Sequence, residues 1–389
     1  MRVHRRTTVL ALSVALLAAT GPLAAPASAA PAAPAASAPA VRARTPAGPD
    51  GAALRAALAG LPDGDATAAL VRVGGDDGRW RGSAGVHDLA SGRPADPRAR
   101  FRAGSTTKVV TAAAVLRLAA DGRIDLDAPV QRYLPGLLST AFRPVTVRQL
   151  LNHTSGIPAG DGLGDSFEEL YAHRFEYLAP RQVVASAVAK GPEFVPGTRQ
   201  HYLNINYTVL GLLVEEVTGR PYASAATALV LRPAGMRDTS FPGADPRIRG
   251  PHNHGYQKVR RADGTAEFVD VTDWVPADEA AGGMISTTAD LERLLTRLFR
   301  GELVPGPQLE EMFTVPADVP GASYSAGLQR FEHDGRVYWL KSGARYGYST
   351  LLAATRDLSR TLVYSVNSTD AKGEGMNPVA QRIALAALT

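Results

Sequence analysis

The sequence predicts an α+β fold, in which an antiparallel sheet built from both chain ends is flanked by helices and a mainly helical lobe is inserted. Strand-forming runs occur near the start, at residues 68–86, and return from residue 324 onward. Between them, residues 105–298 show mainly helical periodicity that is interrupted by Gly/Pro loops. Strands that flank a helical middle assemble most simply into one sheet with helices on its faces.

The first elements are predicted as a helix followed by a hairpin. Residues 50–61 are typical of a helix. The runs Ala68–Val73 and Arg79–Val86 predict two strands, because Gly74-Gly75-Asp76-Asp77-Gly78 between them is a hairpin turn signal.

The middle of the chain contains helices with clear ends. Thr107–Ala120 is closed by Asp121-Gly122, and Tyr207–Thr218 is closed by Gly219. Glycine directly after a helix favours the left-handed conformation that ends it. Strands then return, and a helix follows them. The predicted C-terminal elements are the strands Tyr324–Phe331, Arg336–Lys341, Tyr348–Thr355 and Thr361–Val366, and the helix Asn377–Thr389.

Composition excludes several kinds of site. The chain has 389 residues and no cysteine, which excludes disulfides, thiolate metal sites and a cysteine nucleophile. His252-Asn253-His254 lacks the helical His-Glu-x-x-His spacing, so a surface loop is the better interpretation. We therefore expect neither a metal nor another cofactor.

The net charge of +5 is concentrated at the N-terminus. Arg2, Arg5 and Arg6 precede the apolar run Val9–Ala25, which predicts a secretory signal peptide at residues 1–29. The pair Arg5-Arg6 leaves the twin-arginine route open. Residues 30–49 are almost all Ala and Pro, as in a linker, and include Arg42 and Arg44. Residues 50–389 are then formally neutral, which argues against a nucleic-acid partner.

The predicted organisation is a signal peptide at 1–29, a linker at 30–49 and a catalytic domain at 50–389. Within that domain the sheet lobe comprises residues 50–100 and 299–389, and the helical lobe comprises residues 101–298. No internal stretch is long and apolar enough for a membrane span. With the signal peptide, we expect a secreted, extracellular protein, and we also expect a monomer.

Ser105-Thr106-Thr107-Lys108 opens the apolar helix Val109–Leu118. Positions i and i+3 share a helix face, so Lys108 is expected to lie over Ser105. A neutral lysine amine can take the hydroxyl proton and activate serine as a nucleophile, and the helix N-terminus favours a developing oxyanion. The alternative is that Ser105 only caps the helix.

Two further short motifs follow. Tyr202-Leu203-Asn204 precedes the helix expected from Tyr207; a tyrosine near two ammonium groups can have a lowered pKa and act as a base. Its alternative is simple loop packing.

Lys341-Ser342-Gly343 ends a predicted strand, where a cation, a hydroxyl and a glycine suit a carboxylate-bearing substrate. Its alternative is a strand end with a solvated lysine.

The order Ser-x-x-Lys, Tyr-x-Asn, Lys-Ser-Gly resembles that of the penicillin-recognising serine hydrolases. It is most similar to the group of class C β-lactamases, D-alanyl-D-alanine carboxypeptidases and related esterases and D-peptidases. Further similar runs are Leu150–Pro158, Asn206–Gly211 and Ala281–Thr287. The resemblance implies a β-lactamase/transpeptidase-like fold from about Asp50 to the C-terminus.

The resemblance also implies roles. Ser105 would be the acylated nucleophile, with Lys108 and Tyr202 sharing base and acid work. The substrate-binding residues would be Asn204, Lys341, Ser342, Gly343 and Ala344, the last giving its N–H to the oxyanion together with that of Ser105. Arg330 and Arg345 are both candidates for the arginine that binds a substrate carboxylate.

The family pattern leaves the activity open. The carboxypeptidases often carry His and Thr where this chain has Lys341 and Ser342, whereas class C β-lactamases carry Lys-Thr-Gly. We expect an exported D-alanyl-D-alanine carboxypeptidase or D-peptidase acting on a small peptide or β-lactam. The alternatives are a class C-like β-lactamase, a carboxylesterase, or an inactive scaffold that binds penicillin or peptidoglycan.

Overall fold

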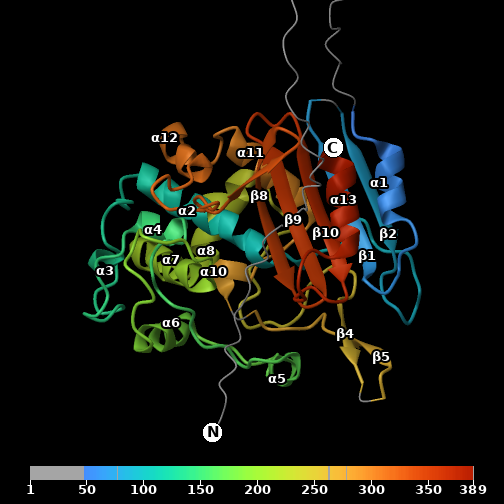
Figure 1. The fold of residues 1–389 in the computed structure, drawn as a ribbon, viewed down its shortest axis with the longest axis horizontal. Helices are drawn as coiled ribbons and strands as arrows, with labels where there is room; N and C mark the ends of the chain where they lie inside the picture. Colours follow the sequence, from blue (N-terminus) through green and yellow to red (C-terminus); the bar gives the residue numbers. More distant parts are fainter. Residues whose placement is uncertain (1–47, 77, 262, 277, 389) are drawn as a thin grey trace, which may run out of the picture.

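The computed structural model describes residues 48–388 apart from residues 77, 262 and 277. The predicted signal peptide and nearly all of the predicted linker lie outside the described residues. The described chain forms an antiparallel six-stranded sheet with helices on its faces, so the predicted α+β fold is confirmed (Figure 1). The sheet order is β2-β1-β10-β9-β8-β7. The strands are β1 (Ala66–Gly74), β2 (Trp80–Gly85), β7 (Gln329–His333), β8 (Arg336–Arg345), β9 (Tyr348–Thr355) and β10 (Thr361–Ser368).

Pairing of β1 with β10 joins the two ends of the chain. Val71 lies opposite Tyr364, and Val73 lies opposite Leu362. Nearly every residue of β1 is buried, because helices cover both faces of the sheet at its centre. The apolar run Ala68–Val73 therefore forms a central strand, as its composition predicts.

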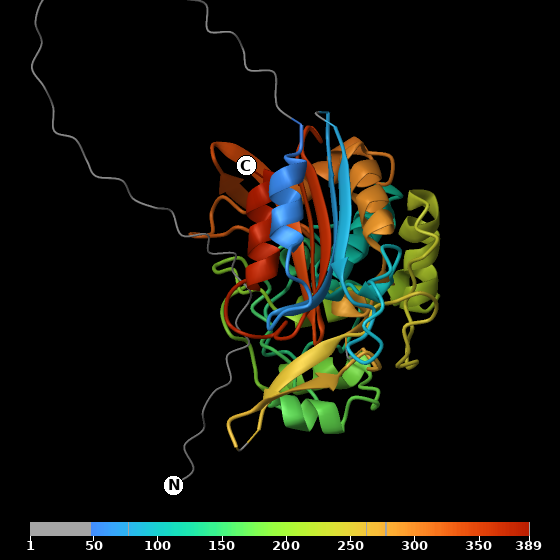
Figure 2. The same cartoon turned by 90° about the vertical axis from the view of Figure 1, so that its right-hand side faces the viewer.

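The two faces of the sheet have separate apolar cores. On one face α1 (Gly51–Leu58) packs beside α13 (Pro378–Leu388), as the edge-on view shows (Figure 2). Their core includes Leu54 and Ile383, which pack over the side chains of β1 and β9. On the other face α11 (Thr288–Phe299) contacts β1, β9 and β10, and the larger core lies there.

Helix α2 (Thr107–Ala120) lies at the centre of the larger core. It is Ala- and Val-rich, and all of its residues but three are buried, so it is surrounded by protein on every side. α7 (Asn204–Thr218) and α10 (Glu279–Gly282) pack against it. The remaining elements are β3 (Phe101–Arg102), η1 (Gly104–Thr106), α3 (Val130–Tyr133), α4 (Val147–Leu151), α5 (Phe167–Ala172), α6 (Pro180–Ala189), α8 (Tyr222–Ala226), η2 (Thr227–Leu231), α9 (Arg232–Ala234), β4 (Tyr256–Arg260), β5 (Ala266–Asp270), β6 (Ile285–Ser286), α12 (Gly306–Leu309) and η3 (Glu310–Phe313).

Three predicted elements need correction. The strand expected at Tyr324–Phe331 begins only at Gln329, because Gly327 adopts a φ of 81° and the N–H of Ser325 bonds to the Leu328 carbonyl in a turn. The strand expected at Arg336–Lys341 runs on to Arg345, since its pairing with β9 continues to Arg345 opposite Tyr348. The hairpin β4–β5 interrupts the expected helical middle.

No helix in the described ranges combines the length and apolar character that crossing a membrane requires.

Candidate active site

Ser105 lies in η1, the short turn that leads directly into α2. The residue at the N-cap of α2 is Thr106, not Ser105, and the alternative of a simple capping serine is wrong. Gly104 adopts a φ of 54°, which a side chain disfavours, and the residue that follows this bend, Ser105, lines a cavity. Ser105 thus borders the cavity and does not cap the start of the helix.

Lys108 lies fully buried beneath Ser105, one turn along α2. Its Nζ is 3.3 Å from Ser105 Oγ, 2.8 Å from Asn204 Oδ1 and 2.7 Å from the Ala281 carbonyl oxygen. Burial lowers the pKa of Lys108 well below its ordinary value, and the charge of Lys341 lowers it further. A neutral amine fits the three contacts: two N–H groups donate to Asn204 and Ala281, and the lone pair faces the Ser105 hydroxyl.

Tyr202 packs its ring between two lysines. The ring centroid lies 5.1 Å from Lys108 Nζ and 4.7 Å from Lys341 Nζ. Burial nevertheless raises the pKa of Tyr202, and the expected lowering is wrong. Burial also lowers the pKa of Lys108 and of Lys341. It therefore disfavours the two positive charges that would have lowered the pKa of Tyr202. The Tyr202 hydroxyl is buried beside Ser105, with no hydrogen-bond partner among the described residues, so it is available as a proton donor.

Lys341 belongs to the interior of β8, not to its end. Burial lowers the pKa of Lys341 to about 7, so the side chain is cationic below that pH and neutral above it. Its Nζ donates to the Ser342 carbonyl at 2.9 Å. The alternative of a solvated lysine at a strand end is wrong.

Gly343 allows β8 to approach the turn that carries Ser105. A Cβ at this position would lie 2.1 Å from the Ala103 carbonyl oxygen and 3.0 Å from Ser105 N. At Gly104 a Cβ would lie 2.6 Å from Ala344 N. The two N–H groups predicted to bind the oxyanion therefore meet at one junction, and only glycines permit it.

Asn204 opens α7 instead of lying in the loop before it. Its side chain is occupied at both ends: Oδ1 accepts from Lys108 Nζ, and Nδ2 donates to Asp278 Oδ2 at 2.9 Å. The expected contact with a substrate amide remains a prediction, and Asn204 also acts as a bridge between Lys108 and Asp278. The buried ring of His153 packs against this segment, with its centroid 4.5 Å from that of the Tyr202 ring and tilted by 44°.

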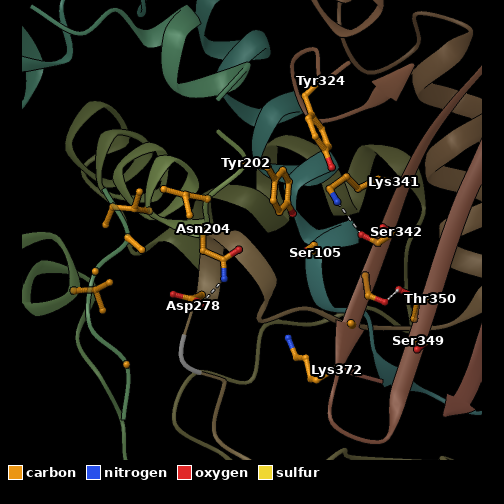
Figure 3. A pocket seen from close by; sticks show the side chains of 18 of the residues that line it. Ser105, Tyr202, Asn204, Asp278, Tyr324, Lys341, Ser342, Ser349, Thr350 and Lys372 are labelled. Atoms are coloured by element: carbon orange, nitrogen blue, oxygen red, sulfur yellow. Dashed lines mark hydrogen bonds between the residues drawn. The ribbon is translucent and has the colours of Figure 1, made fainter. Parts of the chain in front are cut away.

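The predicted site residues surround one cavity of about 240 Å³ (Figure 3). All of them line it except Lys108, which is fully buried. The lining also includes Asp278, Tyr324 and Lys372, which the motif analysis did not single out. Asp278 lies three positions before the Ala281–Thr287 run, and Lys372 is one of only five lysines. Those two signals would have directed attention to them.

Neither arginine considered for a substrate carboxylate lines this cavity. Arg330 pairs with Glu332 on β7. Arg345 Nε donates to the Gly282 carbonyl at 3.1 Å. The lysines of the cavity are therefore its cationic groups. In the described ranges no group of three or more His, Asp or Glu side chains is arranged to hold a metal ion.

A sheet shared by both chain ends and a Ser–Lys pair at the start of a buried helix are the features of the penicillin-recognising serine hydrolases. The sequence model of the Beta-lactamase family matches residues 35–386, and the chain belongs to this family.

Individual relatives differ in activity. Esterase EstB of Burkholderia gladioli is 30% identical over 341 residues, which cover 77% of this chain and 84% of that protein. Penicillin-binding protein 4* of Bacillus subtilis (strain 168) is 26% identical over 306 residues, 75% of this chain and 66% of that protein. The crystal structure of a D-stereospecific amidohydrolase from Streptomyces sp. is similar with a TM-score of 0.74 and 34% identity, covering 87% of this chain and 98% of that one.

Proposed function

We propose that this protein is a D-peptidase, of D-alanyl-D-alanine carboxypeptidase or D-amidase type, that acts through an acyl-enzyme on Ser105. The observation that carries the proposal is the buried Lys108 amine, 3.3 Å from Ser105 Oγ and held by Asn204 and Ala281. Burial lowers the pKa of Lys108, which favours the neutral amine that can accept the hydroxyl proton.

The geometry supports a two-step reaction. Lys108 accepts the Ser105 hydroxyl proton while Oγ attacks the carbonyl carbon of the substrate. The resulting oxyanion faces the N–H groups of Ser105 and Ala344. The carbon–nitrogen bond then breaks, and the protonated Tyr202 hydroxyl supplies a proton to the leaving nitrogen, which Lys108 replaces. Water next attacks the acyl ester and releases the acid and free Ser105.

Amides of D-residues are the preferred substrate class. The match with the D-stereospecific amidohydrolase from Streptomyces sp. covers 98% of that protein, and a penicillin-binding protein is among the relatives. Lys341 supplies a cation beside Ser342 and Gly343 for the carboxylate of a leaving residue at pH values below about 7.

The second candidate is a carboxylesterase, because Esterase EstB of Burkholderia gladioli is 30% identical to this chain. A class C-like β-lactamase is the third, since the same acyl-enzyme serves both reactions. An inactive scaffold is disfavoured, because Ser105, Lys108 and Tyr202 are all present and lie together.

Export after cleavage behind Ala29 completes the proposal, and it rests on the signal-peptide pattern of residues 1–29. The monomeric state stays a prediction.

Intact mass measurement during incubation with penicillin tests the proposal. We expect an adduct of one penicillin that persists for minutes, because acylation outpaces water attack in a peptidase. Ser105→Ala should abolish the adduct. Ser139→Ala, at an exposed loop serine, is the matched control and should keep it.

Two other outcomes contradict the proposal. Rapid turnover of penicillin without a persistent adduct would establish a β-lactamase. Neither adduct nor turnover, together with no hydrolysis of a D-alanyl-D-alanine peptide or a D-amino acid amide, would leave the esterase or the scaffold.

A further inference from the structure

The side chain of Asp278 lines the proposed active-site cavity and does not cap the helix that follows it. It occupies the N-cap of α10, where an aspartate normally accepts hydrogen bonds from the first helical N–H groups. Its side chain makes no such bond. The carboxylate instead lies against the cavity, where Oδ2 accepts from Asn204 Nδ2 at 2.9 Å (Figure 3).

Two carboxylates line the cavity, and Asp278 is the one for which the described residues provide no ion pair. The other lining carboxylate, Asp161, pairs with Lys190 at 2.6 Å. Asp278 lies within 4 Å of no basic group in the described part of the chain. Its negative charge still favours the protonated forms of Lys108 and Lys372. A half-buried, unpaired carboxylate among cations is a ready partner for a cation brought by the substrate.

The position of Asp278 identifies which part of the substrate it meets. Hydrogen bonds link it through Asn204 and Lys108 to Ser105, so it borders the acyl half of the substrate near the nucleophile. In an α-amino acid amide the ammonium group is two bonds from the carbonyl carbon that Ser105 attacks. Such a group must therefore lie close to the wall that Asn204 and Asp278 form.

We propose that Asp278 binds a free α-ammonium group on the residue whose carbonyl is attacked. The inference rests on the proposed function and narrows it. The preferred substrates are amides and short peptides whose acyl residue is an unblocked D-amino acid, and N-acylated substrates bind less well. Asp278 is then a specificity-determining residue, because the amide oxygen of Asn204 is already committed to Lys108.

Calorimetric titration of ligands into a Ser105→Ala protein tests the inference without turnover. The ligands are D-phenylalanine amide and N-acetyl-D-phenylalanine amide, which differ in the ammonium group. We expect the free amine to bind about ten- to a hundredfold more tightly, as is typical of a charge-assisted hydrogen bond. Adding Asp278→Asn should remove this preference, because the new side chain can still accept from Asn204 but carries no charge.

Asp273→Asn is the matched control, since Asp273 is an exposed aspartate of the same connecting segment. It should keep the preference. Should Asp278→Asn melt early, Asp278→Ala in the same background serves as the second variant, with the same expected loss. An unchanged preference in both Asp278 variants, or no binding of D-phenylalanine amide, would overturn the inference.

Failure of the inference is distinct from failure of the proposed function. Penicillin acylation of Ser105 in a protein with intact Ser105 measures the latter. If the adduct forms normally while the ligand preference is absent, only the role of Asp278 is wrong. If the preference is present but no adduct forms on any substrate, the cavity binds unblocked D-residues without the proposed catalysis.

Discussion

At the scale of single residues, the proposed chemistry depends on one buried amine, that of Lys108. Lys108 is completely inaccessible to solvent, and its uncharged form satisfies Asn204 and Ala281 while facing Ser105. The neighbouring Lys341 disfavours a second positive charge nearby. Tyr202 has the opposite tendency, because burial keeps its hydroxyl protonated. Burial thus favours the neutral form of both groups beside Ser105, as the proposed base and acid require.

Replacing Lys108 with arginine tests this assignment. Arginine retains a positive charge and cannot accept a proton, so acylation by penicillin should slow by about 10²–10⁴-fold. The rate is measured by stopped-flow or timed intact mass. Lys258→Arg, at an exposed lysine, should acylate at the wild-type rate. Near-normal acylation of Lys108→Arg would show that another group is the base.

At the scale of elements, the site depends on how closely β8 approaches η1. Thr350 of β9 donates to the Ala103 carbonyl at 2.8 Å, which ties the sheet to the turn before Ser105. Gly343 lies directly at this contact, with no space for a side chain. Ser105 and strand β8 therefore lie close together because two glycines, Gly104 and Gly343, carry no side chain at the contact.

Gly343→Ala should disturb both stability and acylation. The added methyl group would lie 2.1 Å from the Ala103 carbonyl oxygen and 2.5 Å from Thr350 Oγ1, so β8 and η1 must separate. We expect the free energy of unfolding to fall by about 1–3 kcal/mol, as for other overpacked sites, and acylation to slow. Denaturant titration and timed intact mass measure the two effects.

The control for this substitution is Gly306→Ala. A Cβ at Gly306 meets no atom within 4 Å, so stability should change by no more than about 0.5 kcal/mol. Unaltered stability and acylation in Gly343→Ala would mean that the contact between β8 and η1 is easily relaxed.

At the scale of the whole molecule, the first and the last described elements of the chain pack together in one sheet and on one of its faces. β1 pairs with β10, and α1 lies beside α13 over the same face of the sheet. The apolar side chains of that face belong to segments more than 290 residues apart, such as Leu54 and Leu351. The strand that carries the Lys-Ser-Gly motif lies in this shared sheet, so the site depends on both ends.

Ile383→Ala tests the importance of this shared core. Ile383 is fully buried in α13, and truncation should lower the free energy of unfolding by about 2–5 kcal/mol. The acylation rate of the folded protein should stay unchanged, because Ile383 does not line the cavity. Gln381→Ala, on the exposed side of the same helix, should be nearly neutral in stability. A small loss of unfolding free energy in Ile383→Ala would show that the packing of α13 contributes little to the stability of the fold.

The sequence by itself determined the fold class, the family and seven of the residues that line the cavity. Local patterns were sufficient for α2, which begins and ends at the predicted residues, and for β9. Helical spacing alone placed Lys108 over Ser105. These features depend on neighbouring residues along the chain, where periodicity and turn residues carry the information. The roles of the site residues stay predictions.

Only the tertiary structure decided the protonation tendencies and the additional members of the site. Whether the lysines lower the pKa of Tyr202 or burial raises it depends on how much water each group loses, which no local pattern records. Asp278 reaches the site through Asn204, 74 positions away in the sequence, and abandons the capping role that its position suggests. β8 extends through its motif because β9 pairs with it to Arg345. Electrostatics and strand pairing act through space, so contacts between distant segments decide them.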